Sequence, residues 1–193
     1  MSKLEDLINE LCPNGVKYVD LGDICSIRTG KLNANAMVED GEYPFFTCDA
    51  SPYRIDKYAF DSDAILISGN GSQVGHLHRY KGKFNAYQRT YVLDNFSKLF
   101  TKDFLYHFLG AYLKPYILLN CKKGSVPYIT LPMLQRFKIP VPPIEVQHEI
   151  VRILDNFTEL TAELTAELTA RKKQYEYYRD SLLSFKDEVE WKY

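Results

Sequence analysis

The chain has 193 residues, of which 46% are hydrophobic and 25% charged, and its formal net charge is −1 at pH 7. This length fits one domain, or one domain plus an appendage, and excludes a large multidomain enzyme. The composition is typical of a folded chain and argues against disorder, a collagen repeat and a membrane span. Since the sequence shows neither the apolar N-terminal segment of a signal peptide nor a stretch long enough to cross a bilayer, a cytoplasmic location is expected.

The first predicted element is a short amphipathic helix. Ser2 and Glu5 have the spacing of a capping box, and apolar residues follow at helical intervals until Pro13 ends the pattern. After this helix, short apolar or alternating stretches are separated by Gly, Pro and Asn, which predicts a β-rich body. Within the body, residues 104–119 have a helical pattern that we expect Pro115 to interrupt.

Charge is unevenly distributed along this body. Residues 64–93 and 104–144 contain nine Lys and Arg residues and no Asp or Glu. If both segments fold onto one face, that face is positive enough to attract phosphate groups, although the whole chain is nearly neutral. The alternative is that buried strands exclude every charge and that the rest of the pattern arose by chance.

A glycine-rich segment, residues 69–75, follows the apolar run that ends at Ile67. It is not a dinucleotide-binding fingerprint, because a strand-like basic stretch follows it instead of a helix, and the first acid afterwards is Asp94. Such a turn lets backbone amides come close to a phosphate and places polar side chains within reach of base edges. A purely structural turn is the alternative explanation.

The sharpest boundary in the sequence follows Pro142 and Pro143. From Ile144 to about Phe185 no Gly or Pro interrupts a helix, and at about 1.5 Å per residue this helix would be about 60 Å long. Apolar residues recur at alternating steps of four and three, which indicates a coiled-coil seam. A helical pair folded back within the chain is the alternative, but no turn signal supports it. The seam positions are Ile150, Leu154, Phe157, Thr161, Leu164, Leu168, Arg171, Tyr175, Tyr178, Leu182 and Phe185.

A tandem repeat lies inside this predicted helix. Residues 161–164 and 165–168 both have the sequence Thr-Ala-Glu-Leu. Each unit adds about 6 Å of rise and about one turn plus 40° of rotation. Gain or loss of one unit would therefore move whatever lies at the end of the helix by a fixed step.

The sequence contains no recognisable catalytic or metal-binding pattern. Its four cysteines form no CxxC pair, and His76 and His78 form an HxH without a third ligand nearby. Nucleophile-elbow, zinc-protease, Walker, methyltransferase and nuclease motifs are all missing from it. We therefore expect a binding module that needs no metal or cofactor of its own, rather than an enzyme.

Three segments stand out in the chain as a whole: residues 65–71 (Ile-Leu-Ile-Ser-Gly-Asn-Gly), residues 84–90 (Phe-Asn-Ala-Tyr-Gln-Arg-Thr) and residues 139–147 (Ile-Pro-Val-Pro-Pro-Ile-Glu-Val-Gln). Together they resemble the DNA specificity subunit of type I restriction-modification systems. The step from prolines to helix, followed by the repeats, resembles the spacer of that family. Gln147 and His148 stand where the family commonly has Glu and Gln, a difference that we expect to be harmless. Such subunits usually carry two recognition domains and two helical regions, whereas this chain has material for one of each.

The resemblance implies an α+β fold. A β-rich target-recognition domain with small helices would occupy residues 1–143, and a helical spacer and dimerisation region forming an antiparallel coiled coil would occupy residues 144–193. With one recognition domain per chain, a homodimer would read two identical half-sites in inverted orientation. The expected interface residues are Ile150, Leu154, Phe157, Leu164, Leu168, Tyr175, Tyr178 and Leu182.

The resemblance also implies the partners of the chain. It would read double-stranded DNA without catalysing a reaction, while modification subunits methylate adenine with S-adenosylmethionine and a restriction subunit cleaves DNA with ATP and Mg. No membrane partner is expected.

Candidate DNA contacts lie in the glycine-rich segment, in the strand after it and in a loop at residues 122–125. Their Lys side chains suit phosphates, whereas the Asn, Gln and Arg side chains can make bidentate contacts to bases. We expect Lys122→Ala to weaken binding to all DNA and Gln73→Ala to relax one base position. The candidates are Ser68, Asn70, Ser72, Gln73, His76, His78, Arg79, Lys83, Gln88, Arg89, Lys122, Lys123 and Ser125.

Two other classes of protein fit part of the sequence, and an uncharacterised enzyme is a third alternative. A coiled-coil scaffold unrelated to restriction explains the helix but not the acid-free segments. A DNA-binding transcription regulator explains both features but not the family resemblance. A gel shift with random duplex DNA separates a scaffold from a DNA-binding protein, and recovery of a methyltransferase in a pulldown separates restriction specificity from repression.

Overall fold

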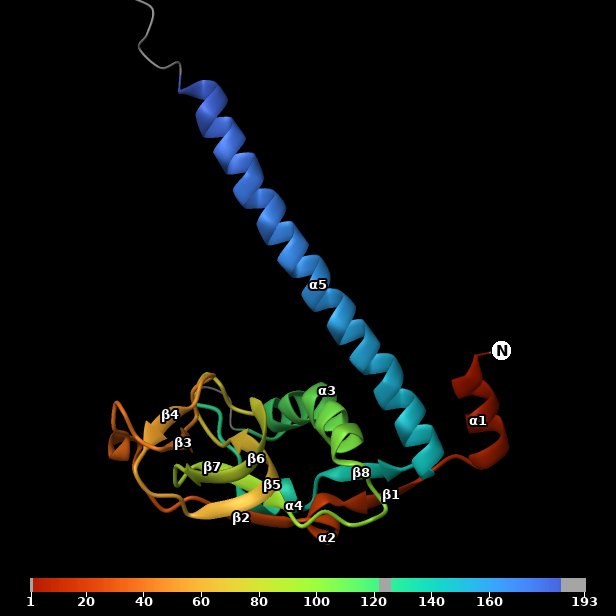
Figure 1. Ribbon diagram of the computed structural model, residues 1–193. Coiled ribbons are helices and arrows are strands. Elements are labelled where there is room, and N and C mark those ends of the chain that lie inside the picture. The colour runs from red at the N-terminus through yellow and green to blue at the C-terminus, as the bar shows by residue number, and fades with distance from the viewer. Residues whose placement is uncertain (1, 122–125, 185–193) are drawn as a thin grey trace, which may run out of the picture. The chain divides into compact units, whose positions relative to one another are not determined.

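The computed structural model describes residues 2–121 and 126–184 (Figure 1). The chain divides into two units, Met1–Val151 and Arg152–Tyr193. The division falls inside the last helix, whereas the sequence places the domain boundary at the start of that helix. No helix in the described part of the chain combines the length and the apolar character that crossing a membrane requires.

The N-terminal unit is built around a six-stranded mixed sheet. The strand order is β2–β7–β5–β6–β3–β4, and every neighbouring pair is antiparallel except β3 and β6. This arrangement confirms the predicted β-rich body. The strands are β2 (Ser26–Thr29), β3 (Tyr43–Phe46), β4 (Tyr53–Ile55), β5 (Phe60–Ser68), β6 (Leu77–Ala86) and β7 (Thr90–Asp94).

The sheet is strongly curled. β5 begins with Phe60 opposite Phe84, near the end of β6, but it ends with Ser68 opposite Thr90, the first residue of β7. Only residues 87–89 connect β6 to β7, so β6 must bend back toward the other end of β5. Gly82 in β6 has a φ of +126°, a conformation that residues with a side chain rarely adopt, and it therefore suits a bend in this strand.

Apolar side chains pack on both faces of the sheet. Along β5, Ile65 and Ile67 join the core that includes residues of helix α3 (Lys102–Asn120), while Leu66 joins a second cluster on the opposite face (Figure 1). The alternation follows from the pleat of a strand, which sends successive side chains to opposite faces. The second cluster contains Phe46, Phe60, Ala64, Leu66, Phe84, Ala86 and Val92.

Helix α3 continues through Pro115, so the interruption expected there is wrong. Proline removes one backbone hydrogen bond and costs a helix interior about 3 kcal/mol. Leu113 and Ile117, on either side of it, are fully buried, while Pro115 itself lies on the exposed side. Each such buried side chain contributes about 1.5–3 kcal/mol, so burial of this face offsets the missing hydrogen bond.

A two-stranded antiparallel sheet brings together the two ends of the N-terminal unit. In it β1 (Lys17–Asp20) pairs with β8 (Lys138–Val141), the strand that precedes the long helix. The predicted N-terminal helix is α1 (Lys3–Leu11), and its capping box between Ser2 and Glu5 is present. The remaining short helices are α2 (Leu21–Ile24), η1 (Ala34–Ala36) and α4 (Leu131–Gln135).

A buried amide fixes the first turns of α5 (Ile144–Leu183) within the N-terminal unit. The Oε1 atom of Gln147 accepts a hydrogen bond from the Thr101 N–H at 2.9 Å. Its Nε2 donates to the carbonyl oxygens of Leu99 at 2.8 Å and Pro142 at 2.9 Å. Ile150 packs against the same core, so this predicted seam residue is used inside its own unit.

In the C-terminal unit, α5 runs uninterrupted to Leu183, which confirms the predicted long helix, and Phe185 lies outside the described residues. The repeat threonines donate their hydroxyl hydrogen bonds to carbonyl oxygens four residues earlier, at 2.7–2.8 Å for Thr161, Thr165 and Thr169. The exposed apolar side chains of the seam are Leu154, Phe157, Leu164, Leu168, Tyr175, Tyr178 and Leu182. The fold is thus a mixed sheet with helices followed by a long helix, the predicted α+β class.

Candidate nucleic-acid interface

Three loop segments meet where β5 ends and β7 begins. The Gly69 N–H donates to the Arg89 carbonyl at 2.8 Å, and the Gly71 N–H donates to the Pro127 carbonyl at 3.1 Å. The Ile129 N–H in turn donates to the Gly69 carbonyl at 2.7 Å. The curl of the sheet therefore makes neighbours of segments that are far apart in sequence. Residues 69–76, 87–89 and 126–129 together form a loop cluster.

Gly69 allows two backbones of the loop cluster to approach closely. A Cβ at this position would lie 2.2 Å from the Arg89 carbonyl oxygen, a distance that no side chain can tolerate. Part of the glycine-rich segment therefore serves the fold itself, in agreement with the alternative that this segment is a structural turn. Ser72 and Gln73 in the same segment nevertheless have exposed side chains, which leaves them available to a ligand.

A cavity of about 340 Å³ opens in the loop cluster, and Gly69, Gln88, Arg89, Tyr91 and Ile129 line it. The Tyr91 hydroxyl donates to the Ile129 carbonyl at 3.0 Å and thereby joins two walls of the cavity. Gln88 and Arg89 are exposed, and Arg89 forms no ion pair with the described part of the chain. An amide and a guanidinium placed side by side are the groups that make bidentate contacts to adenine and guanine.

A second groove, of about 410 Å³, separates the loop cluster from α3. Lys114 on α3 is exposed at this groove, and no carboxylate of the described residues pairs with it. The groove thus has both a cation suited to a phosphate and neutral groups suited to bases. Its lining residues are Gln73, Gly75, His76, Leu77, Tyr106, His107, Gly110 and Lys114.

His76 and His78 contact each other edge to face, with their ring centroids 4.6 Å apart. Burial lowers the pKa of His78 below its ordinary value; the Asp49 carbonyl, 3.4 Å from Nε2, opposes this shift, and His76 adds to it. His78 is therefore neutral at pH 7 and suits a base edge better than a phosphate. Across the described residues, no three His, Cys, Asp or Glu side chains are grouped to hold a metal ion.

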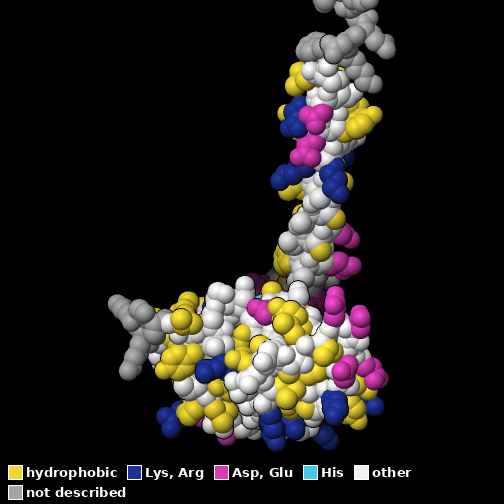
Figure 2. Space-filling model, turned by 90° about the vertical axis from the view of Figure 1, so that its left-hand side faces the viewer, with side chains coloured by type: hydrophobic (Ala, Val, Ile, Leu, Met, Phe, Trp, Pro, Cys, Tyr) yellow, Lys and Arg dark blue, Asp and Glu magenta, His cyan; other side chains and the backbone are white. Residues whose placement is uncertain are grey.

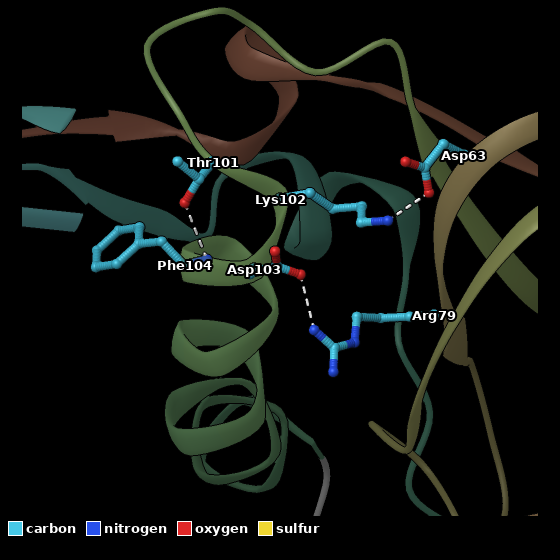
Figure 3. A network of polar contacts seen from close by, with 6 residues as sticks. All are labelled: Asp63, Arg79, Thr101, Lys102, Asp103 and Phe104. Carbon is cyan, nitrogen blue, oxygen red and sulfur yellow. Dashed lines mark hydrogen bonds and ion pairs between the residues drawn. The ribbon is translucent and has the colours of Figure 1, made fainter. Parts of the chain in front are cut away.

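Arg79 is engaged in a structural contact at the start of α3 (Figure 3). Its Nη1 donates to the Asp103 carboxylate at 2.7 Å, and its guanidinium lies 4.3 Å from the ring centre of Tyr106. Lys102 forms an ion pair with Asp63 beside it. These contacts fasten the N-terminus of α3 to β5 and β6, so DNA would have to compete with Asp103 for Arg79.

The other predicted contacts are distributed differently. Ser68 is 1% exposed, and its buried hydroxyl lacks a hydrogen-bond partner among the described residues, so it cannot touch DNA in this structure. Lys83 lies 4.8 Å from the ring centre of Tyr58 and opposite Asp61 in the β5–β6 register. Asn70 lies in the loop cluster. Lys122, Lys123 and Ser125 fall outside the described residues.

The acid-free segments do not form a purely basic face. Neighbouring segments supply carboxylates to them: Asp63 lies opposite Lys81 across the β5–β6 pair, and Asp20 pairs with Lys138 at 2.7 Å. Part of the predicted charge is therefore neutralised locally. Figure 2 still shows Lys and Arg side chains along the lower edge of the N-terminal unit on the face in view, with hydrophobic side chains between them.

The sequence did not point to residues 126–129. Tyr128 forms an isolated antiparallel bridge with Asn70, which makes this segment an extra strand-like edge of the loop cluster. Tyr128 is 42% exposed, so an aromatic ring lies next to a predicted base contact. No sequence pattern marks a single tyrosine after a Lys-Gly-Ser loop. Its position beside Asn70 depends on the fold.

Comparison with known proteins identifies the family of this chain. Residues 13–171 match the family described as "Type I restriction modification DNA specificity domain". The specificity subunit of the EcoDI type I restriction enzyme from Escherichia coli is 42% identical over 139 residues, covering 72% of this chain and 30% of that subunit. The EcoprrI specificity subunit of Escherichia coli is 33% identical, covering 100% of this chain and 55% of that subunit. The chain belongs to the family of type I restriction-modification DNA specificity domains.

Solved structures of S subunits share the fold. The HsdS subunit from Thermoanaerobacter tengcongensis has a TM-score of 0.66 at 21% identity, over 96% of this chain and 50% of that chain. The S subunit from M. genitalium has a TM-score of 0.63 at 20% identity, over 90% of this chain and 48% of that chain. The chain thus spans about half the length of these structures, and 30% and 55% of the two curated relatives.

Proposed function

We propose that this chain is a non-catalytic DNA specificity subunit that reads one half-site of a target for a type I restriction-modification complex. The observation that carries the proposal is the loop cluster, whose backbone hydrogen bonds hold together the loops that carry exposed Gln73, Gln88 and Arg89. Gln88 and Arg89 line its cavity, and Gln73 lines the groove beside it. Membership in the specificity family supports the proposal. The side chains of the cluster support it independently, because they are the bidentate groups that reading base edges requires.

Residues of the loop cluster and of the neighbouring β6 and α3 would take different roles. Gln73, Gln88 and Arg89 would contact base edges, while Lys114, across the second groove, would bind a phosphate. Tyr128 would offer its ring to an apolar edge such as a thymine methyl group. His78, kept neutral by burial, would serve as a hydrogen-bonding group rather than as a cation.

We also infer that the chain acts as a homodimer. The seam of α5 leaves seven large apolar side chains exposed, from Leu154 to Leu182, and a second copy of the helix would cover them. Two identical readers related by a twofold axis bind two identical half-sites in inverted orientation. The two chains together would then match the two recognition domains of a full-length specificity subunit.

The partners of the dimer would be methyltransferase and restriction subunits. These partners, rather than this chain, would bind S-adenosylmethionine, ATP and Mg. Support comes from the family match and from a solved type I restriction-modification assembly that shares the fold, with a TM-score of 0.71 at 22% identity over 94% of this chain and 49% of that chain.

Two substitutions separate the proposed roles. Gln73→Ala is expected to relax one base position, losing about 1–3 kcal/mol of discrimination. Lys114→Ala is expected to weaken all duplexes alike and to reduce the salt dependence of binding by about one phosphate contact. The preferred sequence is measured by enrichment from randomised duplexes, and affinity is measured at several salt concentrations.

Lys17→Ala provides a control, because Lys17 is an exposed lysine of β1, outside the loop cluster. It is expected to leave both measurements unchanged. Equal losses of affinity for Gln73→Ala and Lys114→Ala, on selected and random duplexes alike, would show that these roles are assigned incorrectly.

The repeat is expected to set the distance between half-sites. One additional Thr-Ala-Glu-Leu unit after Leu168 lengthens the helix by about 6 Å and turns it by about 40° more than a full turn. This length is close to two base-pair rises of about 3.4 Å. We expect a spacer longer by one or two base pairs and unchanged half-sites when the methylated positions are mapped. Altered half-site bases would contradict this role.

A further inference from the structure

The turn that connects β3 to β4, residues 47–52, lies beside the loop cluster, although none of its residues belongs to that cluster. The Tyr87 N–H donates to the carbonyl of Phe46, the last residue of β3, at 2.9 Å. The Cys48 thiol donates to the Arg89 carbonyl at 3.5 Å. The end of β3 and the turn after it are therefore joined to the loop cluster by hydrogen bonds.

The turn carries an acid, Asp49, whose side chain is exposed but fixed in place. Its Oδ2 accepts a hydrogen bond from the Thr47 hydroxyl at 3.1 Å, and its N–H donates to the same hydroxyl oxygen at 3.2 Å. Thr47 is only 3% exposed, so it is a well-anchored support. A hydrogen bond with the Asp49 carboxylate also raises the pKa of Tyr53 above its ordinary value. Two side chains therefore hold this carboxylate.

The carboxylate of Asp49 is available to a ligand at the edge of the candidate site. The Asp49 carbonyl lies 3.4 Å from Nε2 of His78, a predicted base contact. Within residues 2–121 and 126–184, no Lys or Arg forms an ion pair with Asp49. An ionised carboxylate accepts about four hydrogen bonds, and Thr47 and Tyr53 use only part of this capacity.

The side chains assigned to bases so far include no group that only accepts hydrogen bonds. Gln73 and Gln88 suit adenine, and Arg89 suits guanine. In the major groove, cytosine presents its N4 amino group as a donor, and Asp and Glu are the side chains that accept from it. A carboxylate is also repelled by phosphates, so on a DNA-binding surface it is unfavourable unless a base donates to it.

We propose that Asp49 is a specificity-determining residue that accepts a hydrogen bond from the N4 amino group of a cytosine in the half-site. Thr47 and Tyr53 are its positioning residues. The negative charge of Asp49 also disfavours duplexes without cytosine at this position, because no donor then offsets its repulsion from phosphates. This role rests on the proposed function and adds one defined base to the target.

Enrichment from randomised duplexes with the full-length chain tests this role. The half-site of the wild-type chain is expected to contain a cytosine for which Asp49→Ala reduces the preference at least about fivefold. Asp49→Asn is expected to shift the same position toward adenine, because an amide makes a bidentate contact with adenine. Both variants are expected to bind random duplexes about two- to fivefold more tightly at low salt, since each removes a negative charge.

Asp6→Asn is the matched control, because Asp6 is an exposed acid of α1, outside both the turn and the loop cluster. It is expected to leave the selected sequence and the affinity unchanged. A half-site without a C·G pair, or an unaltered base preference in Asp49→Ala, would overturn the role of Asp49 and leave the proposed function standing.

Thermal unfolding separates base reading from support of the turn. Asp49→Asn and Asp49→Ala are expected to have Tm values close to that of the wild-type chain. A lower Tm, with equal losses of affinity for selected and random duplexes, would assign Asp49 to the fold and overturn its role in reading DNA. A wild-type chain that selects no sequence at all would overturn the proposed function itself and, with it, this role.

Discussion

Replacing Leu164 by Glu is expected to weaken self-association of the chain at least about a hundredfold. Leu164 is exposed in the single chain and is buried in the proposed homodimer. Burying one leucine contributes about 1.5–3 kcal/mol, and a symmetric dimer contains two copies of it. Since about 1.4 kcal/mol corresponds to a tenfold change in affinity, the lost burial alone accounts for a hundredfold. Sedimentation equilibrium over a range of concentrations measures the effect.

Ala166→Glu is the matched control for this substitution. It introduces the same side chain two residues away, at a heptad position that faces away from the seam. This variant is expected to self-associate like the wild-type chain and to be equally helical by circular dichroism. A Leu164→Glu chain that dimerises as tightly as Ala166→Glu would show that the seam does not hold two copies together.

Gln147→Ala is expected to destabilise the N-terminal unit by about 3 kcal/mol, since it leaves one buried and two partly buried backbone groups without partners, and an unsatisfied buried group costs about 1–3 kcal/mol. Gln147 is 0% exposed and bonds to backbone atoms of Leu99, Thr101 and Pro142. For a chain of this size the loss corresponds to a decrease in Tm of roughly 6–12 °C. Differential scanning calorimetry measures it directly.

His148→Ala provides the comparison, because His148 is the exposed neighbour of Gln147 on the same helical turn. Surface substitutions of this kind usually change the free energy of unfolding by less than about 0.5 kcal/mol. The same calorimetric experiment is expected to find its Tm close to that of the wild-type chain. Equal Tm values for the two variants would mean that the buried amide does not fix the start of α5.

Local sequence signals predicted the helices well. The capping box between Ser2 and Glu5 starts α1, and the absence of Gly and Pro after Pro143 lets α5 run to Leu183. These features depend on residues three or four positions apart, so a single sequence contains them. The passage of α3 through Pro115 depends on burial against distant strands, which local propensity does not report.

The order and pairing of the strands could not be predicted from the sequence. β3 pairs in parallel with β6, and β1 pairs with β8 across more than a hundred residues. Such pairing depends on how distant strands are brought together, and their apolar residues fit many partners equally well. The curl of the sheet, which brings the loop cluster together, follows from this pairing rather than from any motif.

The candidate site was predicted in part. Gln73, Gln88 and Arg89 were selected for their chemistry, and the fold does bring their loops together. Arg79 was selected for the same chemistry, but it pairs with Asp103, which lies outside both acid-free segments. Counting charges along a chain misses such a partner, because ion pairs form between segments that are distant in sequence.

Mapping adenine methylation is the most direct test of the proposal that two copies of this chain each read one half-site of the DNA target. The wild-type chain is expressed with a type I modification subunit in cells that lack other adenine methyltransferases, and methylated positions are read by single-molecule sequencing. The expected result is one target of two identical half-sites in inverted orientation, separated by a spacer of constant length. Two different half-sites, a single unpaired site, or methylation without sequence preference would contradict it.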